Sequence, residues 1–320
     1  YAMMSNQWTM GSPAYPNAVP NTHGIPKALN DQVLIAPFND LEKAAAIIAE
    51  HRDDLAGVII EPVQRTFEPK PGFLQGIREV TANYDIPLIF DEVVTGFRLG
   101  LGGAQGLYGV TPDLCATGKA ISGGLPLGVL CGRADIMAIA NPKRRLQMLP
   151  FSMQTGTFSS NPVCASVALA LIEEFEKPGT YERLEEVGTR VRQGLRDAIA
   201  GSGIEACVTG VPSVFEIWFC EDAPYDHRSS KASDFYKNIR FSDLLLRRGV
   251  LKAAEKFFIS AVHTDEDTVR HIIGLQPDLS HSQACGATPV NGLLTFAAGH
   301  ALEAELLDLR NSGDTSGDKS

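Results

Sequence analysis

Two apolar segments, residues 55–63 and 86–94, constrain the fold of this chain more than any other feature. Each is a continuous apolar run rather than an alternation, which is typical of a strand buried on both faces of a sheet. A stretch with helical spacing, residues 72–84, separates them. A strand, a helix and a strand in this order predict a βαβ unit, and therefore a parallel sheet covered by helices on both faces.

Both predicted strands end in acidic residues. Glu61 ends the first run, and Asp91 and Glu92 fall near the end of the second. The carboxyl ends of parallel strands meet at one edge of the sheet, and folds of this class bind their ligands there. We therefore expect the chemistry of the protein at this edge.

The remaining sequence predicts further elements on either side of a change at Asn161-Pro162. Upstream of it we expect an irregular loop and one helix, at residues 10–31 and 41–51. Downstream we expect helices and short strands, at residues 163–175, 181–200, near 207, at 215–219 and at 232–248, and a further helix starting at Thr264. These elements predict a large α/β domain over 1–162, a smaller α+β C-terminal domain over 163–275, and an atypical, partly disordered tail over 276–320.

Composition excludes several functions. The chain has 320 residues, a formal net charge of −10 and a sequence pI of about 5.2, so it offers no general basic surface to nucleic acid or anionic lipid. No apolar run reaches the roughly 18 residues of a membrane span, and no basic-then-apolar leader precedes the first polar stretch. Six scattered cysteines favour free thiols in a reducing compartment, so we expect a cytoplasmic protein.

The sequence also lacks the motifs expected for a metal site and for a dinucleotide site. The seven histidines are spread out with no H-E-x-x-H, so we expect no metal. The glycines of residues 100–106 have the spacing G-x-G-x-x-x-G, one residue longer than a dinucleotide fingerprint, and no strand immediately precedes them. The chain opens at Tyr1 in a segment that reads like the middle of a domain, so we expect further sequence upstream.

The most informative segment is residues 117–128, where Lys119 lies among four glycines. Glycines let the backbone pass close to a flat ligand, and a lysine in such a lined pocket readily loses its proton and forms a Schiff base. Asp91 lies 28 residues earlier, at the end of a buried strand, where a carboxylate needs a cation or a strong donor. The ring nitrogen of pyridoxal phosphate (PLP) would be such a partner. The alternatives are that Lys119 is a surface lysine, and that Asp91 caps a turn or pairs with Arg98.

Four ordered motifs carry a resemblance to a known family. They are Ile60-Glu61-Pro62-Val63, Phe90-Asp91-Glu92-Val93 with Thr95-Gly96-Phe97-Arg98, Thr117-Gly118-Lys119 with Gly123-Gly124, and Gly156-Thr157-Phe158-Ser159 with Asn161-Pro162. In order and spacing they resemble the class III (ω-type) aminotransferases over about residues 1–273. Within that family the chain looks most like the glutamate-1-semialdehyde 2,1-aminomutase branch, through residues 72–74, 102–105 and 263–264.

The resemblance implies a fold-type I PLP-dependent transferase, with a mostly parallel sheet flanked by helices, that works as a homodimer with shared active sites. Lys119 would hold PLP as a Schiff base and shuttle a proton, and Asp91 would bind the ring nitrogen. Val94 would pack on the ring, and Thr157 would reach the phosphate bound by the other subunit. Glu61 would position groups that contact the cofactor.

Glu255 aligns with the aminomutase carboxylate that contacts the substrate's amino side. The partners would be a small amino donor and a carbonyl acceptor, and the reaction could be transamination or intramolecular amino transfer, because Lys119 and Asp91 serve both. The family's phosphate-binding helix start, the aromatic that stacks on the ring and the arginine for a substrate carboxylate are absent from this sequence. An inactive fragment or paralogue that acts only as a dimer partner is therefore a further alternative.

Overall fold

The computed structural model describes residues 3–4, 14–20, 23–247, 250–253 and 255–264. The first lobe of the molecule is built on a four-stranded sheet of order β3-β4-β5-β6. Its strands are β3 (Val58–Ile60), β4 (Leu88–Glu92), β5 (Leu114–Thr117) and β6 (Val129–Gly132). β3, β4 and β5 are parallel and β6 is antiparallel to β5. The βαβ prediction is therefore confirmed.

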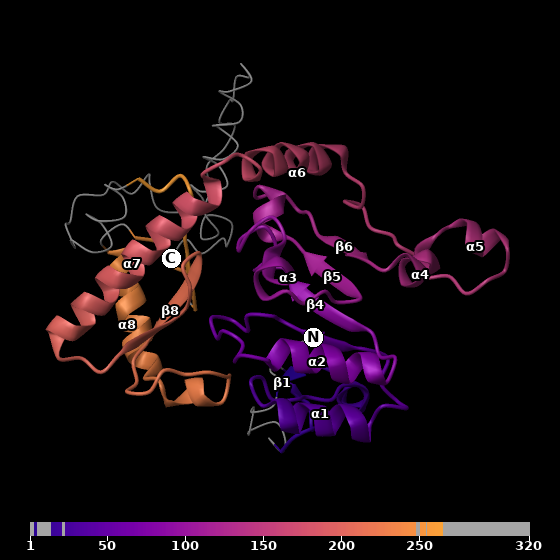
Figure 1. Ribbon diagram of the computed structural model, residues 1–320, viewed down its shortest axis with the longest axis horizontal. Helices are drawn as coiled ribbons and strands as arrows, with labels where there is room; N and C mark the ends of the chain where they lie inside the picture. The colour runs from indigo at the N-terminus through magenta and orange to yellow at the C-terminus, as the bar shows by residue number, and fades with distance from the viewer. Residues whose placement is uncertain (1–2, 5–13, 21–22, 248–249, 254, 265–320) are drawn as a thin grey trace, which may run out of the picture.

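Helices flank this sheet, as Figure 1 shows, although β6 stays exposed. α1 (Leu41–Glu50) and α2 (Phe73–Asn83) lie together on one side, where they enclose a core with β4 residues such as Leu88 and Phe90. α6 (Pro162–Phe175) lies on the other side, against the turn η2 (Lys119–Ser122). Smaller elements of this lobe are β1 (Met3–Met4), β2 (Val19–Pro20), η1 (Lys27–Gln32) and α3 (Gly103–Tyr108).

An arm leaves the sheet after β6 and returns at α6. It carries α4 (Ala134–Met137), η3 (Ala138–Ala140) and α5 (Lys143–Leu146), which project away from the rest of the lobe in Figure 1. Large apolar side chains on it are exposed, among them Leu146 at 85% and Met148 at 92%. An apolar surface of this kind is unusual on a protein that has no partner.

The second lobe is built on an antiparallel sheet of order β7-β8-β9. Its elements are α7 (Thr180–Ser202), β7 (Cys207–Val211), β8 (Val214–Trp218), η4 (Ser229–Ala232), α8 (Phe235–Leu246) and β9 (Phe257–Phe258). Val187 and Val191 of α7 and Phe215 of β8 are fully buried in its core. The domain limits expected from the sequence, 1–162, 163–275 and 276–320, stay a proposal.

Local hydrogen bonds explain where the predicted elements begin and end. α1 starts at Leu41 because Asp40 accepts a bond from the Lys43 N–H, and α6 follows Asn161, which accepts from Val163 and Cys164. The strand expected over 55–63 is shorter, because the Leu55 N–H bonds to His51 in the turn after α1. Likewise the strand expected over 86–94 is limited to 88–92.

Two expectations were wrong in detail. The loop expected over 10–31 contains part of the 3₁₀ helix Lys27–Gln32, which starts after Pro26 with a bond from the Leu29 N–H to the Pro26 carbonyl. The helix expected over 232–248 starts at Phe235, because Asp234 caps it by accepting from the Lys237 N–H. The helix expected after Thr264 and the tail lie outside the described residues.

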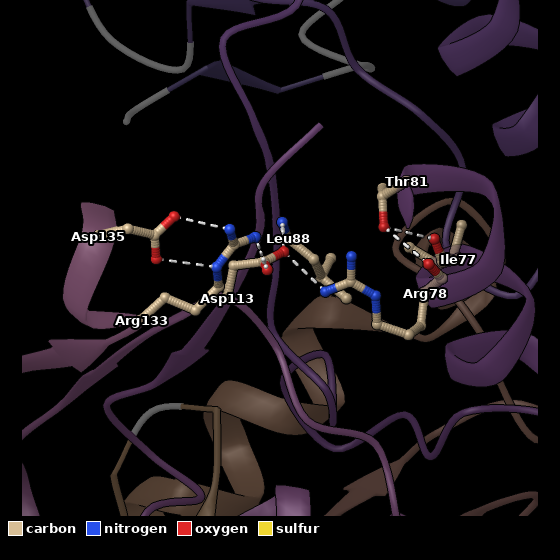
Figure 2. Close-up of polar contacts among 7 residues, drawn as sticks. All are labelled: Ile77, Arg78, Thr81, Leu88, Asp113, Arg133 and Asp135. Carbon is tan, nitrogen blue, oxygen red and sulfur yellow. Dashed lines mark hydrogen bonds and ion pairs between the residues drawn. The ribbon is translucent and has the colours of Figure 1, made fainter. Parts of the chain in front are cut away.

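The amino ends of β4 and β5 are fastened by an ion-pair network centred on Asp113 (Figure 2). One Asp113 oxygen accepts from the Leu88 N–H at 2.8 Å and from Arg78 at 2.7 Å, and the other accepts from Arg133 at 2.9 Å. Burial alone would raise the pKa of Asp113, but these three donors together lower it to about 2. Charge at this end of the sheet is therefore balanced within the chain.

Candidate active site at the carboxyl edge of the sheet

The register of β4 and β5 brings the two central residues of the sequence prediction to one edge. Asp91 pairs with Ala116 and Glu92 pairs with Thr117, so Lys119 follows β5 at the edge where β4 ends. Neighbouring strands lie about 4.8 Å apart, so the Asp91 and Lys119 backbones belong to one small surface region. The strand pairing thus places the Asp91 and Lys119 backbones at the same edge of the sheet.

The two acids at the end of β4 have opposite surroundings. Glu92 is 1% exposed and accepts four hydrogen bonds, from the Thr95 hydroxyl at 2.9 Å, from the N–H groups of Ala104 at 2.6 Å and Gln105 at 3.2 Å, and from the Gln105 amide at 3.0 Å. This carboxylate ties the start of α3 to β4. Its partners are complete, so its role is to hold the loop in place.

Asp91, in contrast, is only partly buried, and its carboxylate accepts one bond, from the Val93 N–H at 3.0 Å. Within the described part of the chain no cation pairs with it, and Arg98 instead donates its Nε–H to the Val94 carbonyl at 3.2 Å. The Arg98 guanidinium also lies 4.7 Å from the Phe258 ring centroid, and burial lowers its pKa to about 10. The pairing with Arg98 that the sequence left open is therefore absent among the described residues, whereas the bond from the Val93 N–H is the turn cap that was the other alternative. The second oxygen of Asp91 keeps acceptor capacity for a ligand.

Lys119 has a strained backbone. Its φ is +48°, which is uncommon for a residue other than glycine, and it follows an extended Gly118. The Ser122 hydroxyl bonds to its carbonyl at 2.7 Å and fixes the turn. The side chain is exposed, and its amine has no hydrogen bond or ion pair to any residue that the structure describes. Strain at a residue with a reactive side chain is a common property of functional sites.

Close backbone approach explains one of the glycines nearby. A Cβ on Gly96 would lie 2.2 Å from the Thr117 hydroxyl, so the loop after β4 packs directly on the end of β5. The Thr117 hydroxyl at this contact and the Gln64 side-chain oxygen, in the loop after β3, are buried without a partner among the described residues. Buried polar atoms are normally paired, so both are further candidates for ligand contact. The sequence analysis missed Gln64, although it directly follows the Glu-Pro-Val motif.

The other predicted residues surround this edge at different depths. Glu61 is partly buried after β3 and accepts from the Arg65 N–H at 3.2 Å. Val94 lies partly buried in the loop after β4. Glu255 is exposed in the second lobe and reaches the edge through Arg65, whose guanidinium lies 3.9 Å from it. Thr157 is exposed near the end of the arm.

These residues fit the flat, anionic cofactor that the sequence analysis expects. An acid with a spare oxygen suits a protonated ring nitrogen, an unpartnered amine suits a carbonyl carbon, and the orphaned Gln64 and Thr117 atoms suit ring substituents. No group of three or more metal-ligating side chains occurs among the described residues. A cavity of about 410 Å³ opens elsewhere, where Phe38 and Asn39 meet Tyr225 and Arg228, and it contains none of the predicted site residues.

The described helices include none that is long and apolar enough to cross a membrane. The five described cysteines, Cys115, Cys131, Cys164, Cys207 and Cys220, form no disulfide.

Comparisons with known proteins agree with this geometry. The profile of the class-III aminotransferases matches residues 4–212. Glutamate-1-semialdehyde 2,1-aminomutase 2 of Brevibacillus brevis is 39% identical over 260 residues, which are 79% of this chain and 59% of the relative. The chain thus spans less than two thirds of the length of the curated relatives it matches.

Solved structures show the same fold. An omega-transaminase from Sphaerobacter thermophilus has a TM-score of 0.75 and 33% identity, covering 85% of this chain and 63% of its own. A glutamate-1-semialdehyde-aminomutase from Pseudomonas aeruginosa PAO1, solved in complex with PMP, has a TM-score of 0.69 and 25% identity, covering 81% of this chain and 59% of its own. The fold is that of the fold-type I transaminases and aminomutases, as the motifs predicted.

Proposed function

The chain belongs to the class-III aminotransferase family, and we propose that the protein binds PLP and transfers an amino group from a small donor to a carbonyl acceptor. One observation carries the proposal. Asp91 and Lys119 lie at the same edge of one sheet, and both keep bonding capacity that the described part of the chain does not use. Charged groups left with spare bonding capacity at the carboxyl edge of a parallel sheet are candidates for ligand contact.

Each residue has a defined task in this proposal. PLP, when bound, supplies a ring that accepts the electron pair released at the substrate carbon. Asp91 would accept a hydrogen bond from the ring N–H, and its negative charge would keep that nitrogen protonated. Lys119 would hold the cofactor through its amine and, once the substrate amine has freed it, would move a proton between the substrate carbon and the cofactor carbon. Val94 packs on the ring face, and Glu61 holds the Arg65 backbone at the rim of the site.

The exposed arm supports a homodimer with shared active sites. Leu146, Met148 and Met153 leave large apolar surfaces on the arm, and Thr157 follows them in the sequence. A second copy packed on the arm would bury these side chains and bring Thr157 to the phosphate of the partner's cofactor. We also propose a cytoplasmic location, on the basis of the scattered cysteines.

Borohydride reduction tests the cofactor proposal directly. Full-length protein prepared with PLP should absorb near the visible, lose that band on reduction, and yield one peptide labelled at Lys119. Lys119→Ala should give no label, while Lys143→Ala on the exposed arm should be labelled like the wild type. A wild-type protein that stays colourless and unlabelled contradicts the proposal, and it favours the alternative of an inactive dimer partner.

An intramolecular amino transfer is the second candidate, because glutamate-1-semialdehyde 2,1-aminomutases are about 40% identical to the chain. Glu255, exposed and 3.9 Å from Arg65, would contact the substrate's amino side in that reaction. A mutase needs no added acceptor, since the amino group stays in one molecule. Activity should therefore be compared with and without pyruvate or 2-oxoglutarate, and an absolute requirement for a keto acid would exclude the mutase.

A further inference from the structure

A second lysine, Lys256, is buried next to this edge and has no assigned role. It directly precedes β9 in the second lobe, where its N–H bonds to the Ala253 carbonyl, and only 7% of it is exposed. Its amine forms no hydrogen bond or ion pair with any residue that the structure describes. A lysine is almost never buried without a partner, because removing an ammonium group from water is costly. The buried stem of Lys256 therefore fixes the position of its amine more tightly than that of a surface lysine, and leaves the amine free to meet a ligand.

The charged groups that shift the pKa of Lys256 show which part of the site lies near its amine. Burial lowers its pKa, repulsion from Arg65 and Lys119 lowers it further, and attraction by Glu61 and Glu255 opposes that change. These four groups come from both lobes and include the proposed catalytic lysine. Lys256 thus lies within electrostatic reach of Lys119, on the side of the site that the second lobe covers.

The local charge balance favours an anion. None of the three cations Lys119, Arg65 and Lys256 has a carboxylate within hydrogen-bond distance among the described residues, although Glu61 and Glu255 lie within electrostatic reach. The Arg65 guanidinium meets Glu255 at 3.9 Å, beyond hydrogen-bond distance, so its donors keep bonding capacity. A planar carboxylate can accept from a guanidinium and an ammonium group at once.

We propose that Lys256, with Arg65 beside it, binds the carboxylate of an amino acid or keto acid substrate next to Lys119. This inference rests on the proposed function, since it assigns the substrate class of the same site. It gives the second lobe a part in recognition, because Lys256 belongs to that lobe while Arg65 and Lys119 belong to the first. It also provides a carboxylate anchor within this chain, where the sequence shows none.

The test uses the full-length, PLP-loaded protein and two probes of equal shape, isobutyrate and its neutral amide isobutyramide. Calorimetry should show that the wild type prefers isobutyrate. Lys256→Met should weaken isobutyrate binding by roughly 10- to 100-fold, the value of a hydrogen bond to a charged group, and change isobutyramide by less than about twofold. Lys256→Arg should keep most of the preference, and Lys237→Met, on the exposed face of α8, should behave as the wild type.

Three results would overturn this assignment. The first is a wild type that binds both probes equally, and the second is a Lys256→Met variant that keeps its preference. The third is a Lys256→Met variant that loses borohydride labelling at Lys119 while the wild type is labelled, because the lysine would then serve the cofactor. An unlabelled wild type would instead remove the proposed function itself, so the two failures are distinguishable.

Discussion

Two aspartates at opposite ends of the same pair of strands have very different surroundings. Asp113, at the amino ends of β4 and β5, is held by Arg78, Arg133 and the Leu88 N–H (Figure 2). Asp91, at the carboxyl end of β4, accepts one bond from its own loop. The chain supplies hydrogen-bond donors to both oxygens of Asp113, whereas Asp91 can still accept from a ligand.

This difference separates structural charge from functional charge better than burial does. Glu92, next to Asp91, is fully buried and fully bonded, and it belongs with Asp113 as a fastening group. Asp91, Lys119 and Lys256 differ from these two acids. Each can still form a hydrogen bond or an ion pair that the described residues do not supply. A carboxylate whose donors all come from the fold fastens the structure, whereas a charged group left with spare bonding capacity is a candidate for contact with a ligand.

The same substitution at the two aspartates should have opposite effects. Asp91→Asn should leave the free energy of unfolding nearly unchanged, because only the bond from Val93 is affected. It should reduce the rate of amino transfer by roughly 10²- to 10³-fold, since the ring nitrogen loses the charge that keeps it protonated. Stopped-flow absorbance with PLP-loaded protein measures that rate. Unchanged turnover would remove Asp91 from the mechanism. The functional difference between Asp91 and Asp113 would then be wrong.

Asp113→Asn should act on stability instead. An amide cannot serve two arginines and a backbone N–H at once, so we expect a loss of about 3 kcal/mol in the free energy of unfolding. Below the unfolding temperature the activity per folded molecule should stay within about twofold of the wild type. Urea titration followed by circular dichroism gives the stability. A loss confined to activity would show that the amino end of the sheet also takes part in function.

The free energy of unfolding should also depend on pH through Asp113. The folded pKa of Asp113 is about 2, below its ordinary value of 3.8, so its contribution to stability is present above about pH 4 and is lost as the pH falls toward 2. The shift corresponds to about 2 kcal/mol. Urea titrations between pH 5 and pH 2 should therefore show a smaller acid loss in Asp113→Asn than in the wild type. Equal slopes would mean that other carboxylates dominate the acid loss.

The sequence predicted which residues lie at the sheet edge better than it predicted the hydrogen-bond partners of those residues. Continuous apolar runs, capping residues and the order of the motifs were enough for β4, α1, α6 and the positions of Asp91 and Lys119, because these depend on local pattern and on the parallel connection. Strand ends were less accurate, since Leu55 takes part in a turn rather than a strand. The separation of Glu92 from Asp91 depends on Ala104 and Gln105, whose approach no local pattern reveals.

Lys256 was beyond sequence reasoning for a similar reason. It is adjacent to Glu255, which the resemblance singled out, yet its burial depends on the second lobe meeting the first. Gln64 was within reach, because it follows the Glu-Pro-Val motif, but an unpartnered side-chain oxygen is visible only in three dimensions. Contacts between segments far apart in the chain are the part that composition and spacing do not encode.

The smallest expected effect concerns the glycine that makes room for Glu92. A Cβ on Gly103 would lie 2.2 Å from a Glu92 carboxylate oxygen, and its φ of +57° disfavours any other residue. Gly103→Ala should therefore cost about 1 to 2 kcal/mol in the free energy of unfolding. Gly106, in the same helix, has open space around a Cβ, so Gly106→Ala should be neutral or slightly stabilising. Equal effects of the two alanines in urea titration would mean that the Glu92 contacts do not fasten α3, and that Glu92 belongs with the open carboxylates.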